Sequence, residues 1–205
     1  MKHSNQILTA TALAAALLTG CASMTPTREI SSGYAIFDIQ AGPDLTHGKI
    51  AEAVKVGLQK SMGRVQITNA IPRSPLPEKA PRFRMVSPFK GTSLGALAAA
   101  SGQRLEVPAC DGAILTANAD DTSMRRYGES TTFFACLMPY QGGWSLNVYT
   151  TFEKASGSFS AATLGATLAR TVVGDRSQFI RRTIAGMIEQ VKAAGARATL
   201  VEAYP

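Results

Sequence analysis

The chain has 205 residues, a formal net charge of +7 and a hydrophobic fraction of 45%, which suits one domain with a substantial core. Its lysines and arginines are dispersed, with no run long enough for a nucleic-acid-binding arm, so we expect no nucleic-acid partner. Two interpretations of the basic surface stay open: it is simply solvated, or it attracts anionic lipid, lipopolysaccharide or cell-wall polymer.

The N-terminus has the composition of a secretory signal. Lys2 and His3 precede an apolar run from Ile7 to Leu18, about 12 residues, whereas a membrane-spanning helix needs about 20. A short apolar run after a basic start is typical of a signal peptide. The run ends in Leu18-Thr19-Gly20-Cys21, which resembles a bacterial lipobox.

The lipobox resemblance implies cleavage before Cys21 and acylation of that residue, with chains such as palmitate. It divides the chain into a signal peptide (residues 1–20), a lipidated cysteine with a polar tether (21–32) and a single domain (33–205). Residues 22 and 23 lack the aspartate that resembles a retention signal, which favours the outer membrane, with the domain facing the periplasm. The inner membrane, the cell surface and an ordinary secretory signal are the alternatives.

The first part of the domain predicts a strand, a helix and a second strand. Tyr34–Gln40 alternates in polarity with apolar groups on both faces, which predicts an interior strand. Asp44 or Thr46 can cap a helix, and Gly63 is expected to end it in the left-handed conformation. Val65–Ala70 is the second strand, so we expect a βαβ unit with parallel strands.

The middle of the chain predicts a loop, short elements and a hairpin. Residues 71–81 contain four prolines and are expected to form a surface loop. Residues 131–140 and 144–153 flank Gln141-Gly142-Gly143, a pattern that predicts a hairpin. Shorter strands are expected at 82–86, 105–110 and 113–117, a short helix at about 93–101 and an exposed loop at 118–129.

The predicted hairpin has two apolar faces. Its expected register sets Leu137 beside Val148 and Phe133 beside Phe152. The opposite face of the first strand carries Phe134, Cys136 and Met138, which require a cover against water.

The C-terminal part predicts two helices and a last strand. Ser160 caps a helix to about Val173, and Asp175 caps an apolar-striped helix to about Ala194, followed by a strand at 198–203. These elements predict an α+β fold: a mixed β-sheet with a βαβ start, a central β-hairpin and C-terminal helices packed on one face.

The cysteines divide into one for the lipid and two for a disulfide. With Cys21 acylated, Cys110 and Cys136 remain in an oxidising compartment, where a leftover pair is expected to form a disulfide. The chain has no CxxC motif and no histidine cluster, so we predict no metal ligand.

The residues able to carry out acid–base chemistry are few. His47 is the only histidine after the signal and is expected on the surface, in the first turn of the first helix. Nucleotide-binding motifs are absent from the sequence. Four carboxylates lie near one another and could form an acid/base pair, although solvated ion pairs are the expected state: Asp111, Asp120, Asp121 and Glu129. We therefore predict no catalytic residue and no cofactor.

Together these features predict a membrane-anchored, non-catalytic accessory or interaction component of an envelope assembly or transport system. One alternative is a binding module for an anionic envelope ligand, namely lipid, lipopolysaccharide or cell-wall polymer. Another is a carboxylate-based cell-wall hydrolase. A deep apolar pocket would favour ligand binding, and a flat apolar patch would favour a protein partner.

Overall fold

The computed structural model describes residues 27–100, 106–121, 129–156 and 176–204. The acylation site Cys21 and the helix predicted from Ser160 to Val173 lie outside these ranges.

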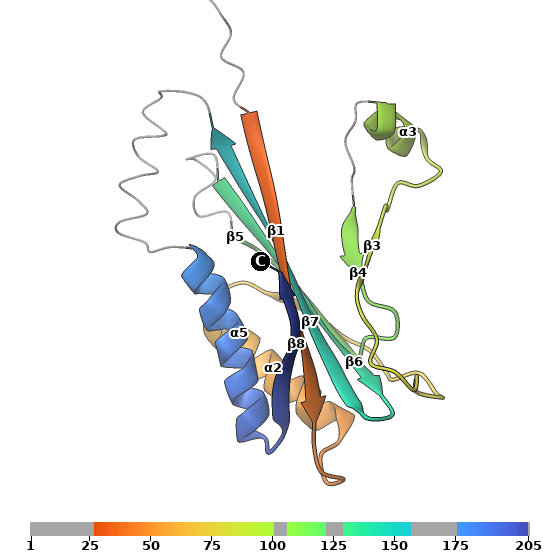
Figure 1. Cartoon of the computed structure of the whole chain (residues 1–205), viewed down its shortest axis with the longest axis vertical. Coiled ribbons are helices and arrows are strands. Elements are labelled where there is room, and N and C mark those ends of the chain that lie inside the picture. Colours follow the sequence, from red (N-terminus) through yellow and green to blue (C-terminus); the bar gives the residue numbers. More distant parts are fainter. Residues whose placement is uncertain (1–26, 101–105, 122–128, 157–175, 205) are drawn as a thin grey trace, which may run out of the picture.

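A six-stranded sheet forms the body of the domain, with the strands in the order β2-β5-β6-β7-β1-β8 (Figure 1). Neighbouring strands are antiparallel throughout. The strands are β1 (Thr27–Gln40), β2 (Gln66–Asn69), β5 (Leu115–Asp121), β6 (Glu129–Tyr140), β7 (Gly143–Ser156) and β8 (Arg197–Tyr204). A second, two-stranded sheet pairs β3 (Arg84–Val86) with β4 (Val107–Ala109). The three described helices are α2 (His47–Ser61), α3 (Ser93–Ala100) and α5 (Arg176–Ala193). The predicted α+β class is confirmed.

The first strand begins earlier than the sequence predicts. β1 starts at Thr27 and pairs with β7 from Thr27 opposite Ser156 to Ile39 opposite Trp144. The prediction of a tether extending to residue 32 is therefore wrong from residue 27 onward. The polar composition of residues 27–32 does not predict a strand. The backbone hydrogen bonds that make it one come from β7, which is distant in the sequence.

The βαβ start takes a different form from the one expected. β1 and β2 run in the same direction, but β7, β6 and β5 lie between them, so no parallel pair forms. Helix α2 connects β1 to β2 along the chain. Strands β5, β6 and β7, which come later in the sequence, form an antiparallel meander between them in the sheet.

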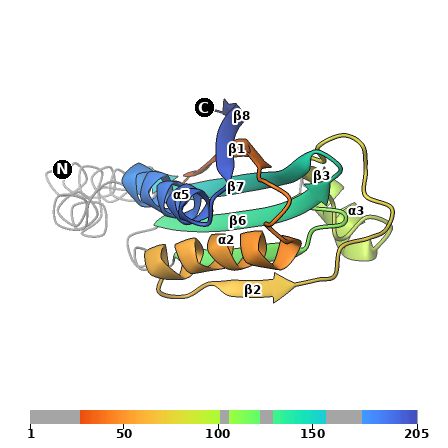
Figure 2. The ribbon, with the colours of Figure 1, turned by 90° about the horizontal axis from the view of Figure 1, so that it is seen from below.

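Helices α2 and α5 lie side by side on one face of the sheet (Figure 2). Thr46 caps α2 by accepting a hydrogen bond from the backbone N of Lys49, as one of the two predicted caps. Gly63, however, does not adopt a positive φ, and the helix ends at an extended Met62. The apolar stripe of α2 is buried in the main core: Ile50, Val54, Leu58 and Met62.

The central hairpin is confirmed, with a different register. Its turn uses two residues, so Tyr140 pairs with Gly143, and Leu137 lies opposite Leu146 instead of Val148. Phe133 likewise faces Thr150 instead of Phe152. The shift is two residues, and because side chains alternate with a period of two, every residue keeps its predicted face.

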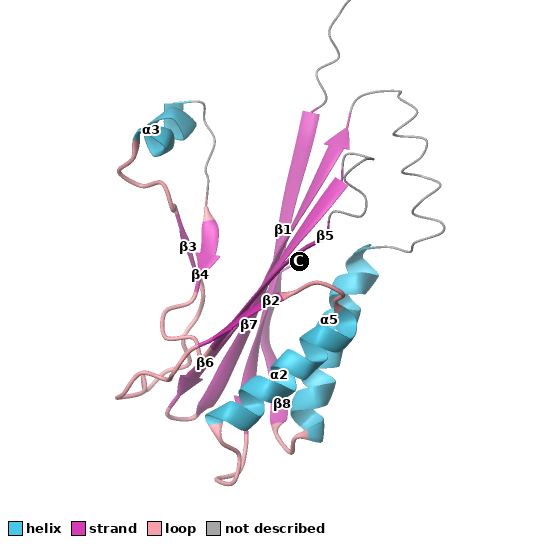
Figure 3. Ribbon diagram, turned by 180° about the vertical axis from the view of Figure 1, so that it is seen from behind, coloured by secondary structure: helices cyan, strands magenta, loops and turns pink. Residues whose placement is uncertain are grey.

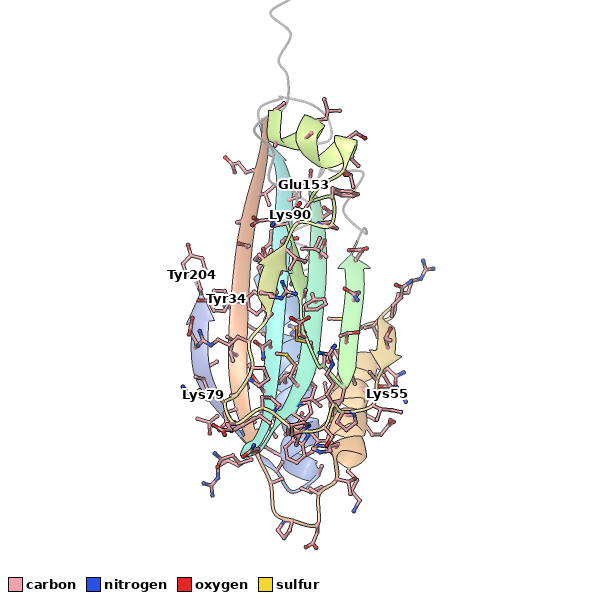
Figure 4. The ribbon with its side chains drawn as sticks, turned by 90° about the vertical axis from the view of Figure 1, so that its right-hand side faces the viewer. Tyr34, Lys55, Lys79, Lys90, Glu153 and Tyr204 are labelled. Carbon is pink, nitrogen blue, oxygen red and sulfur yellow. A yellow bond between two sulfur atoms is a disulfide. The ribbon has the colours of Figure 1, made fainter. Side chains whose placement is uncertain are left out.

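The other face of the sheet carries loops, the β3–β4 sheet and helix α3 (Figure 3). Residues 71–83, here called the proline-rich segment, cross this face before the β3–β4 sheet begins (Figure 4). Beneath them lies a small apolar cluster: Phe134, Cys136 and Met138, packed against Cys110, Ala113 and Tyr149.

Candidate functional site

A disulfide lies on the loop-covered face. The structure joins Cys110 to Cys136 with a Cα–Cα distance of 6.5 Å, which is the pairing expected from the sequence. Cys136 is fully buried within the small apolar cluster. The disulfide ties the turn before β5 to the middle of β6, and it covers apolar surface that would otherwise meet water.

His47 lies against the core instead of on the open surface. It is the first residue of α2, is half-buried, and its Nδ1 accepts a hydrogen bond of 2.9 Å from Nε1 of Trp144. Trp144 is buried, and its indole N–H needs an acceptor, which the histidine supplies. The prediction of a surface histidine is corrected, because the sequence does not show that β7 brings Trp144 under this helix.

The four candidate carboxylates do not form one site. Asp111 precedes β5, whereas Asp120 and Asp121 lie at its far end, opposite Thr132 and Thr131 of β6. Glu129 begins β6 and pairs with Lys154 of β7.

Asp111 is held by an exposed ion pair. Its Oδ2 accepts a hydrogen bond of 2.9 Å from Nε of Arg84. This hydrogen bond and the charge of Arg84, with a further contribution from Arg73, lower the pKa of Asp111. Among the described residues, no three His, Cys, Asp or Glu side chains are grouped to hold a metal ion.

A second cluster, which sequence reasoning missed, connects the proline-rich segment to the last strand. The Tyr34 hydroxyl donates a hydrogen bond of 2.5 Å to Oε1 of Glu202, and Arg82 forms an ion pair with Oε2 of the same carboxylate. The Tyr34 hydrogen bond, followed by Arg82, lowers the pKa of Glu202, and the same hydrogen bond raises the pKa of Tyr34. Alternation on each strand places Tyr34 and Glu202 on a polar face, but the sequence does not reveal that β1 and β8 are neighbours.

Phe83 and the buried amide of Asn147 also attach the proline-rich segment to the sheet. Phe83 contacts the rings of Tyr34 and Tyr149, with both centroid distances at 5.6 Å. Its backbone N donates a hydrogen bond of 3.1 Å to Oδ1 of Asn147, which is buried on β7. Nearby, burial and a hydrogen bond to Asp38 raise the pKa of Tyr140. The polar residues of this sheet face therefore hold the loop in place.

A pocket of about 590 Å³ lies at the edge of the proline-rich segment. The segment is fixed there by Gln141 of the hairpin turn, whose backbone N bonds to the Pro77 carbonyl and whose Nε2 bonds to the Leu76 carbonyl. Four of the ten lining residues are prolines, and the charged ones are Arg73, Glu78 and Asp111. Its volume is within the range of small-molecule sites, and its charges are of both signs.

The open edge of the sheet carries exposed apolar side chains. Among the strands that the structure describes, β8 is the last of the sheet beside β1, and a β-bulge interrupts their pairing between Ile36 and Phe37. Leu200, Val201 and Tyr204 of β8 are 54%, 58% and 60% exposed. Large apolar side chains on an unpaired edge are features of a surface that binds another protein strand.

Neither the family models nor the curated proteins compared with this chain match it. Within the part of the chain that the structure describes, no helix is long and apolar enough to cross a membrane.

Proposed function

We propose that this chain is a lipoprotein anchored through Cys21 in the outer membrane, facing the periplasm, and that it is a non-catalytic accessory or interaction component of an envelope assembly or transport system. The lipobox resemblance supports the anchor. The observation that carries the interaction role is the open β8 edge with its three exposed apolar side chains.

The geometry of β8 suits pairing with a strand of a partner protein. An edge strand offers unpaired backbone N–H and C=O groups, and an added strand binds through them. Leu200 and Val201 are exposed, so they add apolar area to such an interface. Natural edges are commonly protected by charge, whereas the middle of β8, residues 198–201, contains no charged residue.

The partners of the acid–base groups also support a non-catalytic role. Asp111 bonds to Arg84, and Glu202 bonds to Tyr34 and Arg82. His47 accepts a hydrogen bond from Trp144. Each of these groups is used to attach one structural element to another.

The test is rescue of the defect that deletion of the gene causes. We expect Val201→Glu to abolish rescue, because a carboxylate in the middle of the edge opposes strand addition. Thr68→Glu is the matched control, since it places the same charge on exposed β2 at the other edge of the sheet. Both variants must be checked for fold and membrane localisation.

A parallel series tests the non-catalytic assignment. Alanine at Asp111, Asp120, Asp121, Glu129 and His47, singly and together, is expected to leave rescue intact in every variant that folds. Loss of rescue from one carboxylate change, with folding and localisation unaffected, would identify a catalytic role and refute the proposal.

The second candidate is the binding of an anionic envelope ligand, favoured by the 590 Å³ pocket with Arg73 in its lining. If it operates, purified lipopolysaccharide raises the melting temperature of the parent protein and not that of Arg73→Ala. No shift with lipopolysaccharide, anionic lipid or cell-wall fragments would exclude this candidate.

A further inference from the structure

Apart from Ser93 at its first position, helix α3 is apolar, and yet it is mostly exposed. Its sequence, SLGALAAA, contains no charged residue, and Ala98 is its one buried position. Leu94 and Leu97 are 49% and 67% exposed. A helix that is apolar all round is normally buried in a core or in a membrane, so water is an unfavourable surrounding for α3.

The position of α3 in the molecule is informative. α3 lies at the same end of the long sheet as the beginning of β1 (Figures 1 and 4). Helices α2 and α5 lie on the opposite face of the sheet, toward its other end (Figure 3).

A third exposed apolar side chain lies at this end of the molecule. Ile30, near the start of β1, is 72% exposed. Because side chains alternate along a strand, Ile30 shares the face of Tyr34, which is the side of the sheet on which α3 lies. Lys90, which precedes α3, is also at this end and is exposed (Figure 4).

The length of chain before β1 limits how far this end can be from the anchor. Cys21 precedes Thr27 by six positions. Six residues span at most about 21 Å when fully extended. An acylated Cys21 therefore keeps the start of β1, and the end of the molecule that carries α3, close to the membrane surface.

We propose that α3, with Leu94 and Leu97, contacts the lipid bilayer that holds the anchor of this chain. The inference rests on the acylation of Cys21 proposed above. The leucines enter the boundary between headgroups and acyl chains, as the apolar face of an interfacial helix does, and the Lys90 ammonium lies near anionic headgroups. The long sheet then stands upright on the membrane, with the hairpin turn directed into the periplasm.

The test uses the full-length acylated protein reconstituted into phosphatidylcholine–phosphatidylglycerol vesicles that contain brominated phosphatidylcholine. Bromine quenches tryptophan emission only at contact, and the chain has one native tryptophan, Trp144, which is buried. Leu97→Trp places a second indole on α3. Lys79→Trp is the matched control, at an exposed position toward the other end of the molecule (Figure 4).

After subtraction of the parent signal, we expect Leu97→Trp to lose most of its emission and Lys79→Trp to lose none. Leu94→Trp gives a second reading if the first variant folds poorly. Vesicle flotation of the same samples, with Cys21→Ser for comparison, reports the anchor independently.

Flotation without quenching at positions 94 and 97 would overturn the α3 contact and leave the anchor standing. A blue-shifted but unquenched indole would likewise overturn it and indicate a protein partner on α3. Failure of the parent protein to float would overturn both the anchor and the inference that rests on it.

Discussion

At the scale of single residues, glycine permits the two helices to cross closely. A Cβ built on Gly57 of α2 would lie 2.5 Å from Cα of Met187 and 2.8 Å from the carbonyl oxygen of Gly186, both backbone atoms of α5. Backbone atoms cannot rotate away, so the position requires glycine despite its helical location. The sequence does not show this contact, because the apolar pattern of α2 predicts a helix whether or not position 57 touches α5.

Gly57→Ala is expected to destabilise the protein by about 1–3 kcal/mol, the usual cost of overpacking a core. Urea denaturation measures it. Gly48→Ala in the same helix is the control: its Cβ would meet only Oγ1 of Thr46, at 4.0 Å, so stability should stay equal or rise by up to about 1 kcal/mol. Equal stabilities for both variants would show that the helices separate without cost.

Also at the residue scale, Glu202 makes part of the stability depend on acid pH. The pKa of its carboxyl is lowered in the folded protein by Tyr34 and Arg82. A lowered folded-state pKa contributes stability above the unfolded value of about 4.3, and this contribution is lost as the pH falls through the folded value. The pKa of Tyr34 is raised, so its contribution is lost in the opposite direction, as the pH rises past about 10.

Glu202→Gln should therefore flatten the acid side of the stability profile below about pH 4.3. Thermal unfolding at a series of pH values gives the measurement. Tyr204→Phe is the control: Tyr204 stacks on Tyr34, and the change removes only its hydroxyl. An acid limb of unchanged slope in Glu202→Gln would contradict the assignment.

At the scale of elements, the disulfide joins the turn before β5 to the middle of β6. Cys110 and Cys136 are separated by 26 positions. Cross-linking a loop of this length restricts the unfolded chain and is worth about 3.5 kcal/mol in the chain-entropy treatment.

Reduction, or Cys110→Ala with Cys136→Ala, should therefore lower the free energy of unfolding by up to about 3.5 kcal/mol. Urea denaturation with and without reductant measures the loss, and the double variant must be insensitive to reductant. Mass spectrometry of unreduced material exported to the periplasm provides the direct check, where two free thiols would refute the pairing.

The elements that sequence patterns predicted well are those governed by local rules. The β6–β7 hairpin follows from a Gly-Gly turn between alternating strands, and the α2 stripe follows from apolar residues every fourth position. The register of the hairpin was missed by two residues, because Gly143 joins β7 instead of the turn. A Cβ built on Gly143 would lie 2.3 Å from the Ile39 carbonyl oxygen of β1, a long-range contact that a local sequence pattern does not show.

Less of the candidate site than of the fold could be predicted from the sequence. The lipobox resemblance assigns Cys21 to the lipid, and the cysteine count then leaves the Cys110–Cys136 pair, an elimination that needs no geometry. The Tyr34–Glu202–Arg82 cluster joins residues from three distant parts of the chain, and it requires β1 and β8 to be neighbours. Strand order is set by global packing, so a single sequence does not reveal it.

At the scale of the whole molecule, the proposed anchor decides where the protein resides. We expect Cys21→Ser to release the protein from membranes or to stall its processing, because acylation needs the thiol and stable anchoring needs the acyl chains. Fractionation and the mass of the mature N-terminus measure both effects. Cys21→Ser protein that stays in membranes and is cut at the same bond would refute the lipobox interpretation.

The length of β1 has a mechanical consequence for an anchored protein. If the domain is held at Cys21 while a partner pulls on the far end, the tension enters at Thr27 and runs along β1. Its hydrogen bonds to β7, from Thr27 to Ile39, lie across that direction, so they are strained together in shear instead of opening one at a time. We therefore expect the body of the sheet to resist pulling from its N-terminus.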